Sequence, residues 1–239
     1  MSMNQVKPEK LYEKAALKYV AKAMANGKEL KSELLYDGGN KSPSNTLKLS
    51  CGALELKPCN DFASAVKDHG IGDTPFFVES KKHSEEFIDG LFVGKDFEEV
   101  RGFQVTLNAT HTDHTASYWA EHVDQVQQKA KDGTTKARVV WVVPESRYDG
   151  FRAAKMKNTA TVNLKAKEHT RLDRDLLSAI DEAKKLKHSK QRTEELKTAK
   201  DALAKVLDHR QDILSQCEEW KVIYGARLGC GCFCAWLVW

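Results

Sequence analysis

Apolar side chains recur at helical spacing in three parts of the chain. Residues 9–26 form the first segment and end at Asn26-Gly27, a typical helix stop. Residues 115–131 form the second. The third, residues 165–223, is almost free of Gly and Pro and carries two apolar stripes that the charged stretch KHSKQR separates. We expect single helices in the first two segments and two antiparallel helices, a helical hairpin, in the third.

Three apolar runs between these segments have the pattern of strands. FIDGLFV (residues 87–93) and GFQVTL (residues 102–107) are joined by a charged turn, which suits neighbouring antiparallel strands. The second run alternates, so that Gln104 and Thr106 share the face opposite to its apolar residues. ARVVWVVP, residues 137–144, is a continuous β-branched and aromatic run and predicts a strand buried on both faces.

Three weaker patterns complete the outline of the fold. TPFFVES (residues 74–80) suits a short strand, TLKLSCGALELK (residues 46–57) a hairpin or bent strand, and SRYDGFRAAKM (residues 146–156) one more helix. The resulting order predicts an α/β or α+β domain, with layers of helices on a sheet, over residues 1–157. The helical hairpin extends this domain over residues 158–224.

The last segment, residues 225–239 (GARLGCGCFCAWLVW), is unlike the rest of the chain because it lacks any polar periodicity. Its alternating cysteines could bind a soft metal, but C-x-C-x-C without a second cluster is a weak signal. A truncated or frame-shifted reading frame explains such a segment equally well. We expect it to be poorly ordered.

Composition narrows the class of protein without choosing a partner. The chain has 239 residues, 30% of them charged, with a mean hydropathy of −0.55 and a net charge of +4. This mildly basic balance permits a polyanionic partner without arguing for one. We see neither a cleavable secretory signal nor a membrane span. The six cysteines do not form a disulfide framework, which fits a reducing intracellular compartment.

A lone acidic residue, Asp89, interrupts the first of the two neighbouring runs. An unpaired carboxylate is costly to bury, and a bound cation, an ion pair or an exposed strand end would each remove that cost. Adjacent strands could bring Asp89 and Gln104 together on one face, where their oxygens would suit a hard cation such as Mg²⁺. Asp89-Gly90 is also a turn or bulge signal, and that alternative stays open.

Four segments resemble one known family in their order. They are EKLYEKAALKYVAKAMANGKELKSELL (residues 9–35), FIDGLFV, GFQVTLNATHTDHT (residues 102–115) and VVWVVPESRYDGF (residues 139–151). Together they resemble the C-terminal nuclease-like domain of Crinkler proteins and trypanosomatid retrotransposon hot spot proteins. That domain is a divergent branch of the PD-(D/E)XK restriction-endonuclease fold, so the resemblance implies a mixed sheet flanked by helices.

The resemblance also implies a catalytic and metal-binding set. Glu13 would be the acid of the first helix and Asp89 the metal-binding aspartate. Gln104 stands at the position that a second acid usually holds, and Thr106 where a lysine is usual. Glutamine can bind a cation through its carbonyl but brings no charge, and threonine does not stabilise charge as an ammonium does. Read without the family, Glu13 would be an ordinary exposed helix residue.

Two other side chains are candidates to replace the missing lysine, His111 and Lys95. The segment HTDHTASYWAEH also contains His114 and His122, but its spacing matches no metal motif, and we expect its histidines at the surface.

Two functions follow as hypotheses. The first is a Mg²⁺-dependent nuclease, active or degenerate, that acts on DNA or RNA phosphodiesters. The second is a non-enzymatic module that binds nucleic acid or protein, with residues 165–223 as the contact surface; a decayed family member without activity is a third. The family resemblance further implies a nuclear or cytoplasmic protein, with delivery into a host cell if it acts as Crinkler proteins do.

Overall fold

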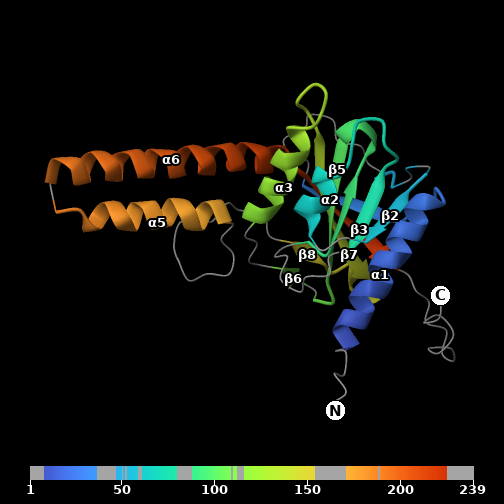
Figure 1. Cartoon of the computed structure of the whole chain (residues 1–239). Helices are drawn as coiled ribbons and strands as arrows, with labels where there is room; N and C mark the ends of the chain where they lie inside the picture. Colours follow the sequence, from blue (N-terminus) through green and yellow to red (C-terminus); the bar gives the residue numbers. More distant parts are fainter. Residues whose placement is uncertain are drawn as a thin grey trace, which may run out of the picture.

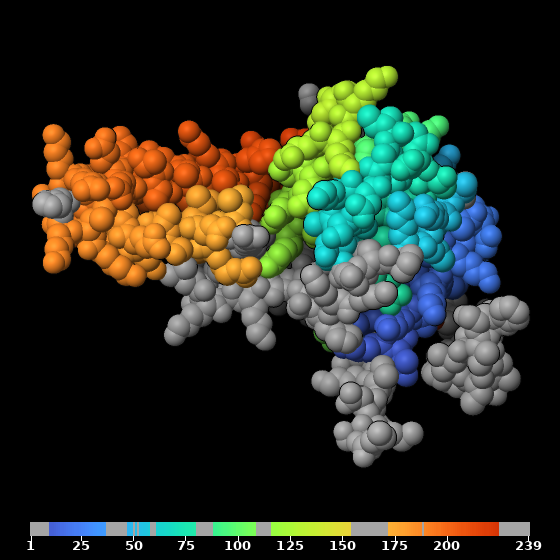
Figure 2. All heavy atoms as spheres, viewed as in Figure 1, coloured from blue at the N-terminus to red at the C-terminus, as the bar shows by residue number. Residues whose placement is uncertain are grey.

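The computed structural model describes residues 8–36, 47–49, 51, 53–58, 61–79, 88–108, 110–111, 116–153, 171–187 and 189–224. In this part of the chain, seven strands form one mixed sheet with helices on both of its faces (Figure 1). A long helical hairpin projects from one side of the sheet (Figures 1 and 2). The predicted class, a mixed sheet flanked by helices with a helical hairpin, is confirmed.

The strand order of the main sheet is β1-β9-β7-β5-β4-β3-β2. The strands are β1 (Ser32–Tyr36), β2 (Glu55–Pro58), β3 (Phe76–Glu79), β4 (Gly90–Val93), β5 (Glu99–Val105), β7 (Lys136–Pro144) and β9 (Glu218–Tyr224). The pairs β2–β3, β5–β7 and β7–β9 are parallel, and the other three pairs are antiparallel. The predicted antiparallel pairing of the two neighbouring runs is therefore confirmed as β4–β5. Two short strands, β6 (Thr110–His111) and β8 (Arg152–Ala153), form a second, parallel sheet.

Helices cover the two faces of the sheet unequally. The helices are α1 (Pro8–Ala25), α2 (Phe62–Lys67), α3 (Ser117–Gln127), α4 (Glu145–Tyr148), α5 (Arg171–Lys185) and α6 (Ser189–Gln216). One apolar cluster joins α1 to the sheet, and the other joins α2, α3 and the end of α6 to the opposite face. We call these the α1 face and the α3 face. Among the described helices, none combines the length and the apolar composition that crossing a membrane requires.

Strand β7 shows why a continuous apolar run becomes the centre of the fold. Its side chains alternate between the two faces: Val140 and Val142 pack in the cluster of α1, and Val139, Trp141 and Val143 in the cluster of α3. All five are fully buried. The prediction of a strand buried on both faces is confirmed, because helices on both sides leave no polar face to this strand.

Helix α1 forms where the sequence predicts it and buries one stripe on the sheet. Ala16, Leu17, Val20 and Met24 are at most 2% exposed and recur at helical spacing. The helix ends because Gly27 adopts a left-handed backbone conformation with φ of 65°, and the following amide of Lys28 donates to the carbonyl of Ala23 at 2.8 Å.

The hairpin of α5 and α6 is fastened to the sheet domain at its base. The guanidinium of Arg210 on α6 lies 2.5 Å from the carboxylate of Asp173 on α5, and both side chains are buried. Arg210 also lies 4.0 Å from Glu121 of α3. A buried ion pair with one partner removed costs several kcal/mol, so the pair of Arg210 and Asp173 holds the two helices of the hairpin together at its base, and Arg210 brings this base close to α3.

The prediction of a helix over residues 218–223 is wrong. These residues belong to strand β9, which lies inside the sheet between β1 and β7. Trp220 and Val222 face the apolar cluster of α1. Residues 1–157 therefore do not hold the whole sheet, since one of its inner strands comes after the hairpin. The segment at residues 225–239 lies outside the described residues.

Two further expectations are corrected. Residues 146–156 do not form one helix: α4 is a single turn that ends at Tyr148, and β8 follows it. In the stretch of residues 46–57, the described strand is β2 alone, and it pairs in parallel with β3 rather than within a hairpin. Asp149 and Gly150 end α4, and they form the same Asp-Gly turn signal as Asp89-Gly90, which the helical pattern of residues 146–156 overlooked.

Substitution of Gly102 tests the packing between β5 and α3. A Cβ atom at this position would lie 2.8 Å from Cγ2 of Ile88, closer than Cβ atoms come to other atoms, and 3.0 Å from Cζ3 of Trp119, which is a tight contact. We expect Gly102→Ala to lower the free energy of unfolding by about 1–3 kcal/mol in urea denaturation. Gly150→Ala is the matched control, because nothing lies within 4 Å of its Cβ position. Equal stability of the two variants would contradict this packing.

Candidate functional site

Asp89 lies at the beginning of β4 rather than in the middle of a strand. Its backbone N–H donates to the carbonyl of Phe103 at 2.7 Å, while the next residue, Gly90, is the register partner of Phe103. Its carboxylate accepts the backbone N–H of Val105 at 2.8 Å. At the end of the β4–β5 pair, the side chain of Asp89 thus accepts a hydrogen bond that a backbone carbonyl would otherwise accept. This agrees with the alternative in which Asp89-Gly90 forms a turn or bulge.

The surroundings of Asp89 favour its neutral form. Burial, together with the nearby carboxylates of Glu13 and Glu79, raises the pKa of Asp89 to about 7. The hydrogen bond from Val105 and the positive charge of Lys10 act in the opposite direction. Glu13 of α1 and Glu79 of β3 therefore both lie within electrostatic reach of Asp89, which makes this end of the sheet negative.

The structure does not bring Gln104 to this group. Gly102, two residues earlier on β5, faces Trp119 of α3, so strand alternation places Gln104 on the α3 face as well. Its register partner Trp141 packs in the same cluster. Glu13 lies on α1 at the opposite face. The predicted set of three ligands is thus split by the sheet.

Thr106 has a structural contact in the turn that follows β5. Its side chain is buried, and its hydroxyl accepts the backbone N–H of Asn108 at 3.1 Å. Its own N–H donates to the carbonyl of Val142 at 3.1 Å. Thr106 therefore shapes the chain after β5 and supplies no positive charge at the position where the family has lysine.

The two substitute candidates lie elsewhere. Lys95 follows β4 at the end of the strand remote from Asp89, in a short 3-10 turn (Lys95–Phe97). His111 belongs to β6, which pairs with β8 in the small second sheet; its side chain is outside the described residues. Neither residue is placed with Glu13 and Asp89.

A cavity of about 440 Å³ lies at that remote end of β4 and is a feature that the sequence pattern did not indicate. Arg101, Glu99, Lys95 and Cys51 line it. The buried guanidinium of Arg101 donates to both carboxylate oxygens of Glu99, at 2.7 and 2.6 Å, and to the carbonyl of Leu49. Its charge is thereby neutralised within the fold, so the cavity is a poor site for an anion. The sequence feature that could have pointed to this cavity is a charged residue within a strand, as Arg101 is in β5.

Of the three predicted ligands, Glu13 and Asp89 lie within electrostatic reach of each other, and Gln104 does not join them. The described residues contain no group of three or more His, Cys, Asp or Glu side chains that could hold a metal. Mg²⁺ nevertheless binds proteins through one or two carboxylates, with water and substrate phosphate as its other ligands. The buried carboxylate of Asp89, whose pKa is raised in part by the charge of Glu13, is a donor whose charged form a divalent cation would stabilise.

Comparison with known proteins adds no family to this picture. No family model matches the chain, and neither a curated protein nor a solved structure matches it. The function therefore has to be argued from the geometry and from the sequence resemblance.

His122, expected at the surface, is instead buried between α2 and α3, where its ring lies edge-on to Phe62 at a centroid distance of 5.5 Å. Burial lowers its pKa from the ordinary 6.5 to about 4, partly opposed by Asp61. The position follows from helical spacing, since Trp119, Val123 and Val126 share the buried side of α3. A neutral histidine here acts as part of the core.

Low pH should lower the free energy of unfolding because His122 binds a proton more readily in the unfolded chain. Between pH 6.5 and 4 the unfolded chain binds a proton on this imidazole and the folded chain does not, so stability falls as the pH falls through this window. We expect a loss of about 3 kcal/mol, measured by urea denaturation at pH 7 and pH 4. His122→Phe, which cannot titrate, should show a smaller loss than the wild type. The same pH dependence in both proteins would contradict this assignment.

Proposed function

We propose that this chain is a divergent nuclease-like domain that acts on DNA or RNA phosphodiesters with the help of Mg²⁺. The observation that carries the proposal is the joint placement of Glu13 and Asp89, from α1 and the beginning of β4, at one negative end of a mixed sheet. These are the two acids that the family resemblance selects from sequence. The helix-flanked mixed sheet supports the same proposal, since it is the architecture which that resemblance implies.

The residues of the proposed site would have separate roles. Glu13 and Asp89 would hold the cation, and the N–H of Val105 would orient the Asp89 carboxylate through its hydrogen bond. Bound Mg²⁺ would supply charge stabilisation for the phosphate. Neither Gln104 nor Thr106 adds a charge there, so we expect activity well below that of an enzyme with a full ligand set.

Asp89→Asn tests this proposal, because it keeps an oxygen for the Val105 N–H and removes the charge. We expect cleavage of plasmid and single-stranded substrates with Mg²⁺ or Mn²⁺ to fall about 100-fold or more, as befits the loss of a cation ligand. Stabilisation by Mn²⁺ in thermal denaturation, present in the wild type, should disappear as well.

The matched control is Asp96→Asn. Asp96 also accepts a backbone N–H, from Gly72 at 2.7 Å, but lies in the turn at the remote end of β4. This variant should keep both cleavage and stabilisation by Mn²⁺. The proposed site would be refuted if Asp89→Asn cleaved the substrates as fast as the wild type does, or if the two variants lost cleavage activity equally.

A second candidate function, a non-enzymatic nucleic-acid or protein-binding module on the same scaffold, is favoured by two observations. Gln104 faces away from Glu13 and Asp89, and the hydroxyl of Thr106 is engaged in a turn. A domain of this kind would bind its partner without metal and would use the projecting hairpin as a contact surface. Binding that persists in EDTA, without cleavage in Mg²⁺, would distinguish it from the nuclease.

A further inference from the structure

The outer end of the hairpin, residues 184–200, concentrates the positive charge of the chain. It contains seven lysines and arginines and two glutamates, a net charge of +5, whereas the whole chain has a net charge of +4. The rest of the two helices, residues 171–183 and 201–216, contains four basic and seven acidic residues. The near balance of the hairpin as a whole therefore conceals a separation of charge along its length. We call residues 184–200 the basic tip.

The cations of the basic tip are available to a partner. All seven side chains are exposed: Lys184, Lys185, Lys187, Lys190, Arg192, Lys197 and Lys200. Lys184 pairs with Asp181 at 2.9 Å, but no ion pair within 4.0 Å joins the other six to a carboxylate in the described part of the chain. Glu195 accepts a hydrogen bond from Gln191 instead. Solvated helices usually interleave and pair their charges, and the basic tip does not.

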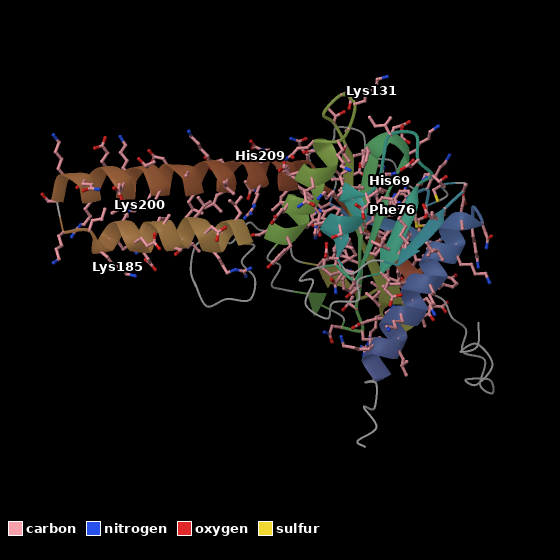
Figure 3. All side chains as sticks on the ribbon, in the orientation of Figure 1. His69, Phe76, Lys131, Lys185, Lys200 and His209 are labelled. Carbon is pink, nitrogen blue, oxygen red and sulfur yellow. The ribbon has the colours of Figure 1, made fainter. Side chains whose placement is uncertain are left out.

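The hairpin holds the basic tip far from the sheet. Helix α6 has 28 residues, which corresponds to a length of about 42 Å. Figure 3 shows Lys185 of α5 and Lys200 of α6 on the outer part of the hairpin, and His209 of α6 near α3, where the imidazole contacts Asp124 at 2.9 Å. Together with the buried pair of Arg210 and Asp173, this contact anchors the inner end. The basic tip is therefore presented on a supported arm rather than on a free tail.

The chemistry of the basic tip favours one class of partner. Protein interfaces centre on aromatic or large apolar anchors, and membrane-bound helices need an apolar face. The basic tip has no aromatic residue, and its two leucines, Leu186 and Leu196, are half-buried within the hairpin. Unpaired lysine and arginine without stacking groups suit the repeated phosphates of a nucleic acid, which they contact without reading bases.

We propose that the basic tip binds the phosphate backbone of a nucleic acid, independently of its sequence. This binding needs no metal and does not depend on Glu13 and Asp89. It would hold a polynucleotide on the hairpin whether or not the sheet domain cleaves it.

A charge-neutralised variant of the full chain tests the proposal. Lys185, Lys187, Lys190 and Arg192 are replaced together by Gln, and binding to a fluorescent 20-base-pair DNA is followed by anisotropy in EDTA between 50 and 200 mM salt. Each lost phosphate contact lowers the magnitude of the slope of log affinity against log salt by about 0.9, so the loss of four contacts should lower it by about 3.6 and weaken the affinity at least about 10-fold. A variant with Arg in place of Lys185, Lys187 and Lys190, which keeps all four positive charges, should bind as the wild type does.

The matched control removes the same charge elsewhere. Lys48, Lys67, Lys131 and Arg147 are exposed on the sheet domain, and their replacement by Gln should change the affinity less than about threefold. Equal weakening by the two fourfold Gln variants would overturn the proposal, because net charge alone would then explain binding. Circular dichroism checks that the hairpin stays helical in each variant.

Two further measurements separate the partner classes. Polyglutamate that displaces the DNA as effectively as unlabelled DNA does would assign the basic tip to acidic proteins and overturn the proposal. Binding to phosphatidylserine vesicles, lost in the Gln variant while DNA binding is unchanged, would overturn it in favour of a membrane. Asp89→Asn should bind DNA normally in EDTA, so failure of the proposed cation site and failure of the basic tip give different results.

Discussion

Strand β9 is buried between β7 and β1, and its backbone N–H and C=O groups must find partners on both sides because water does not reach them. It pairs with seven residues of β7 in parallel and with β1 in antiparallel. Only Cys217 separates this strand from the end of α6. The position of β9 therefore sets where α6 leaves the sheet, and through α6 it sets the direction of the whole hairpin.

Insertion of β9 also decides how the charged residues within the sheet are accommodated. Arg138 of β7 donates to Glu99 of β5 on one side and to Glu218 of β9 on the other, and Trp220 donates to Glu218 as well. Each of these half-buried or buried charges thus has a partner of opposite sign on an adjacent strand. Asp89 lies among other carboxylates instead. This difference is the physical reason to look for function at Asp89 rather than at the larger charged cluster.

Periodicity predicted the elements in which many residues are buried in a regular pattern along the chain. The stripe of α1 and the apolar run of β7 each contain enough buried positions to identify the element. The sequence pattern did not predict strand β9, because EEWKVIY continues a charged helical segment without Gly or Pro. Lys221 looks like a surface residue, yet it is buried, and its ammonium lies 2.8 Å from Glu33 and 3.1 Å from the carbonyl of Tyr148. These partners become visible only in three dimensions.

The candidate site, too, could be predicted from the sequence only in part. A carboxylate inside an apolar run identified Asp89, and alternation correctly separated Gln104 from Phe103 and Val105. Alternation does not say which face α1 covers, and that choice decides whether Gln104 meets Glu13. The basic tip needed both kinds of information. Its charges are plain in the sequence, but their separation from the acidic inner part matters only once the hairpin is seen to project.

The pairing of β1 with β9 has a consequence for the order in which the protein folds during synthesis. Ser32 pairs with Val222, across nearly the whole chain. A ribosome that has released β1, β5 and β7 still holds the strand that joins β1 to the sheet. Until β9 emerges, β1 has no neighbour in the sheet and one edge of β7 stays open, which exposes strand edges to other chains. Completion of the core thus waits for the synthesis of β9.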